Sequence, residues 1–139
     1  MLRRRVALLM FSIVLISTGC SLLSHEAPTD DIDKAAALFF QRFSNEEYDT
    51  IYNDAAKGFK DSQTRQTVTD SLKQMAEQQQ GKILDFQRIS MTFQGEGKRR
   101  MALPVYRTSS DRARAEITLT FQDESGEWKL FGFAYKPRA

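Results

Sequence analysis

Residues 113–136, ARAEITLTFQDESGEWKLFGFAYK, decide the fold of this chain. The first nine alternate between apolar or small side chains and polar ones, which is the period of a strand with one buried face. Asp123-Glu124-Ser125-Gly126 follows as a hairpin turn, because its glycine can adopt a positive φ angle. A last strand runs from Trp128 to Lys136, and Gly132 predicts a bulge that bends it. The stretch therefore predicts an antiparallel hairpin.

Two more strands are predicted before this hairpin. Residues 83–93 alternate, and Gly95-Glu96-Gly97 then turns the chain. Residues 101–106 form the next strand, in which Pro104 cannot donate a backbone hydrogen bond. Pro104 therefore predicts an edge strand or a bulge at that position.

The chain before residue 81 reads as helices. Apolar residues recur at helical spacing over residues 32–43, and a third helix spans residues 62–80. Between them a short helix is expected to start at Ser44, because Ser44 and Glu47 have the spacing of a capping box. Helices followed by strands predict an α+β domain, with N-terminal helices packed on a curved antiparallel sheet of about four strands.

Residues 1–20, MLRRRVALLMFSIVLISTGC, resemble the signal of a bacterial lipoprotein. Three arginines precede an apolar run, residues 6–16, that is too short for a membrane-spanning anchor. Small residues and Cys20 follow in the manner of a lipobox. The resemblance implies that residues 1–19 are a removed signal peptide and that Cys20 is acylated with fatty acids such as palmitate. Residues 20–31 then form a polar tether, and residues 32–138 a single domain.

This processing would place the protein in the cell envelope, anchored to membrane lipid through Cys20. Ser21, which is not aspartate, favours the outer membrane facing the periplasm if the cell is Gram-negative. Removal of the signal takes away three arginines and leaves 17 basic and 18 acidic residues. No overall basic field remains, so we expect no nucleic-acid partner.

The body resembles a bacterial domain family of unknown function within the nuclear transport factor 2-like superfamily of cone-shaped α+β domains. The resemblance covers about residues 32–136 and implies that fold, with no assigned active site. It rests on short motifs: Asn45-Glu46-Glu47-Tyr48, Ala55-Ala56, Gly58-Phe59-Lys60, Gly81-Lys82, Tyr106-Arg107-Thr108, Glu116-Ile117-Thr118-Leu119, Gly126-Glu127-Trp128-Lys129-Leu130 and Gly132-Phe133.

Few residues of the body suit catalysis. Enzymes of this superfamily tend to use an aspartate, often with a histidine, but His25 lies in the tether before the domain. Asp85, on the first strand, is the best remaining carboxylate because its neighbours in register are apolar. The alternative is a solvated carboxylate beside Lys82 or Arg88, which we favour since buried unpaired carboxylates are rare. We expect no cofactor and no metal site.

Two surfaces are candidates for partners. If Trp128 faces the helices, then Phe131, Phe133 and Tyr135 face outward, and such a row is usually covered by a second subunit or another protein. Lys98-Arg99-Arg100, with Arg112 and Arg114 nearby, could form a basic patch for lipid headgroups or an acidic partner, or simply a solvated strand end.

The expected function is that of a non-catalytic protein- or ligand-binding module on a lipid anchor, acting as a homodimer or with an envelope protein through the sheet. The alternative is a small hydrolase, isomerase or lyase that uses Asp85 in an aromatic cavity.

Overall fold

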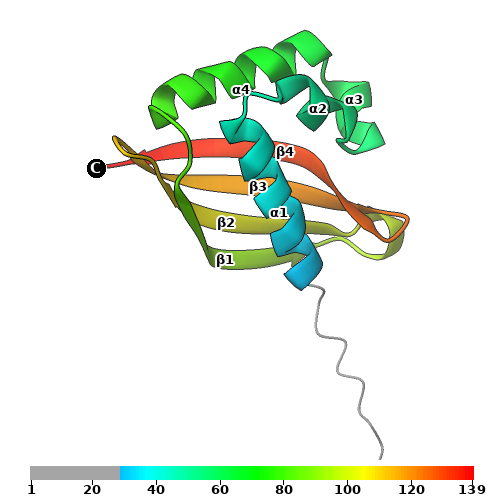
Figure 1. Cartoon of the computed structure of the whole chain (residues 1–139). Coiled ribbons are helices and arrows are strands. Elements are labelled where there is room, and N and C mark those ends of the chain that lie inside the picture. Colours follow the sequence, from blue (N-terminus) through cyan, green and yellow to red (C-terminus); the bar gives the residue numbers. More distant parts are fainter. Residues whose placement is uncertain (1–28) are drawn as a thin grey trace, which may run out of the picture.

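A computed structural model describes residues 29–139, and this part of the chain folds as four helices followed by a four-stranded antiparallel sheet (Figure 1). The predicted α+β class is thereby confirmed. The stretch predicted to be a lipoprotein signal, Cys20 and most of the predicted tether lie outside the described residues. The helices are α1 (Thr29–Ser44), α2 (Tyr48–Asn53), α3 (Lys57–Ser62) and α4 (Arg65–Gln79). The strands are β1 (Asp85–Gln94), β2 (Met101–Ser109), β3 (Arg114–Glu124) and β4 (Glu127–Arg138), with a short 3-10 turn, η1 (Gly97–Arg99), between β1 and β2.

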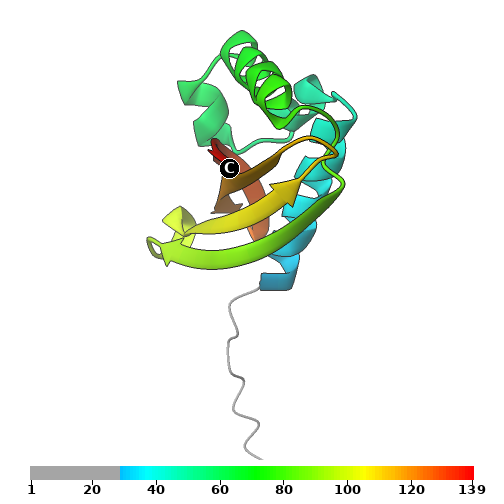
Figure 2. The ribbon, with the colours of Figure 1, turned by 90° about the vertical axis from the view of Figure 1, so that its left-hand side faces the viewer.

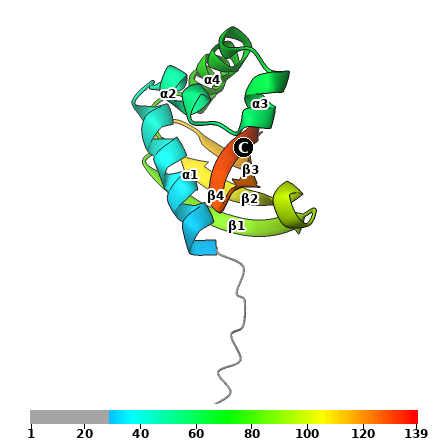
Figure 3. The same ribbon diagram turned by 90° about the vertical axis from the view of Figure 1, so that its right-hand side faces the viewer.

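The sheet has the strand order β1-β2-β3-β4, so each strand pairs with its neighbour in the sequence. It curves around one face, which we call the core face (Figures 2 and 3). Alternate residues of β2 and β3 point to this face and are almost fully buried. The residues between them point to the opposite, outer face; they are polar on β3, but on β2 they include Met101, Leu103 and Val105. The buried residues are Ala102, Pro104, Tyr106, Thr108, Ala115, Ile117, Leu119 and Phe121.

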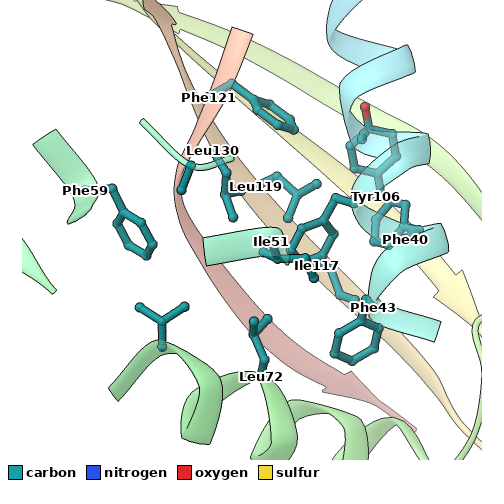
Figure 4. Close-up of a cluster of buried hydrophobic side chains, with 14 of the residues drawn as sticks. Phe40, Phe43, Ile51, Phe59, Leu72, Tyr106, Ile117, Leu119, Phe121 and Leu130 are labelled. Carbon is teal, nitrogen blue, oxygen red and sulfur yellow. The ribbon is translucent and has the colours of Figure 1, made fainter. Parts of the chain in front are cut away.

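Helix α1 crosses the core face because its apolar residues recur every three or four positions. Its buried side chains are Ile32, Ala36, Phe39, Phe40 and Phe43. Helix α4 contributes Val68, Leu72 and Met75 to the same core. Figure 4 shows side chains of the helices packed against Ile117 and Leu119 of the sheet. Burial of large apolar side chains at about 1.5–3 kcal/mol each is the main force that holds the two layers together.

The helix boundaries differ from the prediction in one instructive place. Helix α1 continues through Ser44, and α2 begins only at Tyr48, with no side-chain cap at Glu47. Ser44 does not build a capping box, because its Oγ instead accepts the backbone N–H of Ile83 at 3.1 Å. The turn between the helices is closed by Glu46 at a φ of 60°. A fourth helix, α3, which was not predicted from the sequence, occupies the stretch around Phe59.

Helices α1, α3 and α4 all contact β4, and none of them packs comparably on β1. The segment before α3 reaches the edge of β4, where the N–H of Ala56 donates to the carbonyl of Leu130 at 2.8 Å. A Cβ on Gly58 would lie 3.2 Å from the ring of Phe131, so α3 sits tightly against the same strand. The β4 edge is therefore partly covered.

Candidate binding surface along strand β1

Strand β1 is the other edge of the sheet, and it pairs only with β2. It is ten residues long, and no element among residues 29–139 pairs with its outer side (Figure 1). An edge strand presents unpaired backbone N–H and C=O groups, which are a template for another strand. Proteins usually blunt such edges with charges or proline, but β1 contains no proline and only two charged residues, Asp85 and Arg88.

Exposed apolar side chains gather on the same strand. Among the described residues, five large hydrophobic side chains are at least about one-third exposed, and four of them lie on β1 or immediately before it. These four are Leu84 (70%), Phe86 (36%), Ile89 (40%) and Phe93 (37%), and the fifth is Leu38 (44%) on α1. Single exposed hydrophobic residues are ordinary, but a row along an open edge is typical of an interaction site.

Two of these residues are aromatic rings held by the core. The ring centroid of Phe86 lies 4.7 Å from that of Phe40 and 5.9 Å from that of Tyr106. At the other end of the strand, Phe93 lies 6.3 Å from Trp128, and the guanidinium of Arg100 lies 5.0 Å from the Trp128 ring centroid. Each ring thus has one face fixed against the domain, so a partner would meet a preorganised apolar surface.

A polar cluster fastens β1 to α1. Arg88 Nη1 donates to Asp33 Oδ2 at 2.7 Å, and the Tyr106 hydroxyl donates to Asp33 Oδ1 at 2.8 Å. Burial raises the pKa of Tyr106 far above its ordinary value, and the hydrogen bond and charge of Asp33 raise it further. The phenol therefore stays protonated and donates to the carboxylate, which makes this cluster a clamp between helix and sheet.

A bulge in β1 explains which side chains reach the core. The pairing with β2 shifts between Arg88 and Ser90, so Ile89 has no direct partner. Arg88 pairs with Tyr106 and Met91 with Pro104, and both partners are core-facing residues. An extra residue in one strand changes which positions face the core. The bulge thereby leaves Ile89 exposed at the middle of the open edge.

Asp85, the candidate catalytic carboxylate, does not lie in an aromatic cavity. Its neighbour Phe86 pairs with the buried Thr108, so Asp85, on the alternate position, points to the outer face. Asp85 is exposed and lies opposite Ser109. The reason is that Asp85 and the apolar side chains of β1 that reach the core lie on opposite faces, so the expected apolar surroundings are absent.

The expectation that Phe131, Phe133 and Tyr135 face outward is wrong. Phe133 pairs with Leu119 and Tyr135 with Ile117, so both lie on the core face. Phe133 packs 6.3 Å from Phe39, the Tyr135 hydroxyl donates to the carbonyl of Gln78, and Phe131 packs 6.3 Å from Phe59. The bulge at Gly132 reverses the alternation, so these rings share a side with Leu130 beneath the helices.

The five basic residues that were expected to form one patch lie in two separate places. Lys98, Arg99 and Arg100 lie at the β1–β2 connection, whereas Arg112 and Arg114 lie at the β2–β3 connection, which is the opposite end of the sheet. The guanidinium of Arg100 forms an ion pair with Asp123 at 3.5 Å and also contacts the Trp128 ring. A single patch of all five residues therefore does not form.

An open groove of about 800 Å³ lies between the α1–α2 turn and α4. Its floor is formed by Phe43 and Tyr48, and its rim by charged side chains of both signs. Burial and the Glu46 carboxylate raise the pKa of Tyr48, which keeps this phenol neutral. The charged residues of its lining are Glu46, Lys73, Glu77 and Lys82.

No three potential metal-ligating side chains come together within residues 29–139. In the same part of the chain, no helix has the length and apolar character needed to cross a membrane. Comparison with family models finds no match, and neither does comparison with curated proteins.

Proposed function

We propose that this protein is a lipid-anchored component of the cell envelope whose domain binds another protein, without catalysis, by accepting an extended segment along β1. The observation that carries the proposal is the open edge of β1 with its row of exposed apolar side chains. Strand addition to such an edge derives affinity from backbone hydrogen bonds and specificity from alternate side-chain contacts.

The anchor is supported by residues 1–20, which resemble a signal with a lipobox and end in Cys20, the single cysteine of the sequence. The described fold is compatible with a nuclear transport factor 2-like cone, since helices cover the concave side of a curved antiparallel sheet (Figures 2 and 3). We propose membership of that superfamily on this arrangement together with the motifs of the sequence.

The chemistry of β1 indicates the occupant. Within the strand, Arg88 is already paired with Asp33, which leaves the edge close to neutral. Phe86, Met91 and Phe93 border the core face and offer apolar contacts at one side of an added strand. The fitting partner is a segment of an envelope protein with alternating apolar residues and little charge.

Catalysis is not part of the proposal. Asp85 is exposed on the outer face, and Asp33 is engaged by both Arg88 and Tyr106. The alternative of a hydrolase, isomerase or lyase therefore loses the geometry on which it rested.

The binding site is tested by placing a photoreactive residue at Ser90 on β1 or, as a control, at Lys136 on β4 in intact cells. We expect a crosslink from position 90 to an extended segment of another envelope protein, mapped by mass spectrometry. A synthetic peptide of that segment should then slow amide exchange along β1 and leave β4 unchanged.

Ile89→Lys should weaken binding of this peptide at least tenfold, because the charged side chain would be buried against the added strand. Leu38→Lys, which charges an equally exposed side chain on α1, should not. A crosslink to a second copy of the chain would show that β1 forms a homodimer and does not bind another protein. Slower amide exchange only in β4 after peptide binding would exclude β1 as the binding site.

The anchor is tested separately by metabolic labelling with a palmitate analogue. The wild-type protein should incorporate the label and Cys20→Ala should not; labelling of both would refute acylation at Cys20.

A further inference from the structure

At one end, the outer face of the sheet carries a group of cations that outnumber the carboxylates beside them. We call it the basic face; it consists of Arg107 on β2, Arg114 on β3, and Lys136 and Arg138 on β4. Each alternates with a core-facing neighbour, so all four point away from the helices. All four residues are exposed.

The sheet fixes these cations next to one another. Arg114 lies directly opposite Arg138, and Glu116 lies between Arg107 on one side and Lys136 on the other. Like charges at directly opposed positions destabilise a sheet. Glu116 lies among them, with its Oε1 3.6 Å from Arg138 Nη1, and Asp85 lies on the same outer face at the border of the group, opposite Ser109 and diagonal to Arg107. Four cations thus share two carboxylates.

Over the whole domain, basic residues are concentrated in the sheet and acidic residues in the helices. Residues 29–81 carry six basic and ten acidic residues, whereas residues 82–139 carry eleven basic and seven acidic residues. The helices are therefore net negative and the sheet is net positive. Arg112, in the β2–β3 connection, adds a further cation beside the basic face.

We infer that the basic face docks on the phosphate headgroups of an anionic bilayer, and this inference rests on the lipid-anchored part of the proposed function. A broad, rigid array of cations matches a surface of many phosphates, and each Lys or Arg near such a surface raises the docked-to-undocked ratio about fivefold. From Cys20 to Thr29 the chain spans at most about 30 Å, so an acylated protein would hold the domain within reach.

A second copy of the chain is a poorer occupant. A two-fold interface would place each basic face against itself, and the repulsion among eight cations would oppose it. Docking through the outer face also leaves the helices and the α1–α2 groove turned away from the membrane. It leaves the β1 edge lateral and accessible, so both binding events can occur together.

The test uses the acylated protein purified from membranes, with one fluorophore on an introduced cysteine. Thr118→Cys places the label on the outer face, and Gln74→Cys places it on α4 as a control. The mass of the N-terminal peptide is measured first, so a failure of the lipid anchor is recognised independently. If no acyl chain is found, the same variants are mixed with the same vesicles and centrifuged. Flotation of the protein with the anionic vesicles then measures binding by the basic face without the anchor.

Reconstitution compares phosphatidylcholine vesicles with vesicles that also contain phosphatidylglycerol. We expect a headgroup quencher to reach the label at position 118 only in the anionic vesicles, and 0.5 M salt to reverse the quenching. The label at position 74 should stay accessible to an aqueous quencher in both.

Substitution of Arg107, Arg114 and Lys136 by glutamine should lower the docked-to-undocked ratio by on the order of 100-fold. The same substitution of Lys34, Lys73 and Lys82, which removes equal charge away from the basic face, should change it little. Equal quenching in both vesicle types, insensitivity to salt, or unchanged docking of the first variant would overturn the inference. If millimolar inorganic phosphate displaces the protein from the vesicles, the ligand of the basic face is free phosphate instead of a bilayer. If only a soluble acidic polypeptide, and not the vesicles, shields the label at position 118 from an aqueous quencher, the ligand is a protein.

Discussion

The two edges of the sheet differ more than any other pair of regions in this domain. Strand β4 is flanked by three helices, receives a hydrogen bond from the segment before α3 and carries Lys129, Lys136, Pro137 and Arg138 near its ends. Strand β1 is contacted by α1 on its core side, at Phe86 and Arg88, but it contains no proline and exposes apolar residues along its length.

The difference shows how one sheet can be stable and still open for pairing. The β4 edge is closed with local devices: a bulge at Gly132, a proline and the packing of Phe131 and Phe133 beneath the helices. The β1 edge is held from its core side only, through Phe86 and the Asp33–Arg88 clamp. Its outer backbone groups therefore stay available while the strand itself remains in register.

The largest expected effect comes from truncating one apolar side chain on each edge. Phe133→Ala should lower the free energy of unfolding by about 2–3 kcal/mol, because the ring packs between α1 and β3. Ile89→Ala should cost less than about 1 kcal/mol, because the side chain is 40% exposed. Urea denaturation measures both, and equal costs would contradict the difference between the edges.

The clamp on β1 gives the next largest effect. Asp33→Ala leaves the buried Tyr106 hydroxyl and Arg88 without their acceptor, which should cost about 1–3 kcal/mol. Asp31→Ala is the matched control, since it removes only an exposed ion pair with Lys34 at 3.7 Å. Hydrogen exchange should show faster opening of β1 than of β4 in the first variant, and uniform loosening would argue against a local clamp.

Alkaline pH should weaken the same clamp. Because the pKa of Tyr106 is raised above its ordinary value of 10.0, the unfolded chain loses this proton at lower pH than the folded chain. The associated stability is complete below about pH 10 and decreases above it, by about 1.4 kcal/mol per pH unit. Tyr106→Phe should show a shallower decline, whereas a decline identical to that of the wild type would show that Tyr106 does not cause it.

The smallest effect on stability is expected at the open edge itself. Ile89→Lys should change the free energy of unfolding by less than about 0.5 kcal/mol, because it alters an exposed position. It should nevertheless slow aggregation at high concentration, since a lysine on an edge strand opposes edge-to-edge pairing. Light scattering follows this process, and an unchanged rate would mean that β1 is not the self-associating edge.

Much of the fold could be predicted because the apolar residues of its helices and strands repeat with the period of each element. The alternation over residues 113–121 and the spacing in residues 32–43 each record a buried face, and both elements form where they were expected. Ser44 failed as a capping residue because its hydroxyl bonds to Ile83, 39 residues away, and no local pattern records such a partner.

The candidate sites were harder to predict for a related reason. A strand alternates with period two only until a bulge, so the expected bulge at Gly132 already implied that Phe133 and Tyr135 change sides. Pro104 was expected at an edge or bulge but lies in the interior strand β2, where Leu103 and Pro104 have no partners in β3. The Asp33–Tyr106 bond joins residues 73 positions apart and needs the folded chain to be seen.

The division of charge between helices and sheet makes the described domain an electric dipole with equal numbers of basic and acidic residues. Such a molecule feels little net pull in a uniform field but a strong torque, and it turns before it is attracted. It should be retained by cation-exchange and anion-exchange resins alike at low salt, each binding the opposite half. Its isoelectric point is therefore a poor guide to how it behaves beside a charged surface.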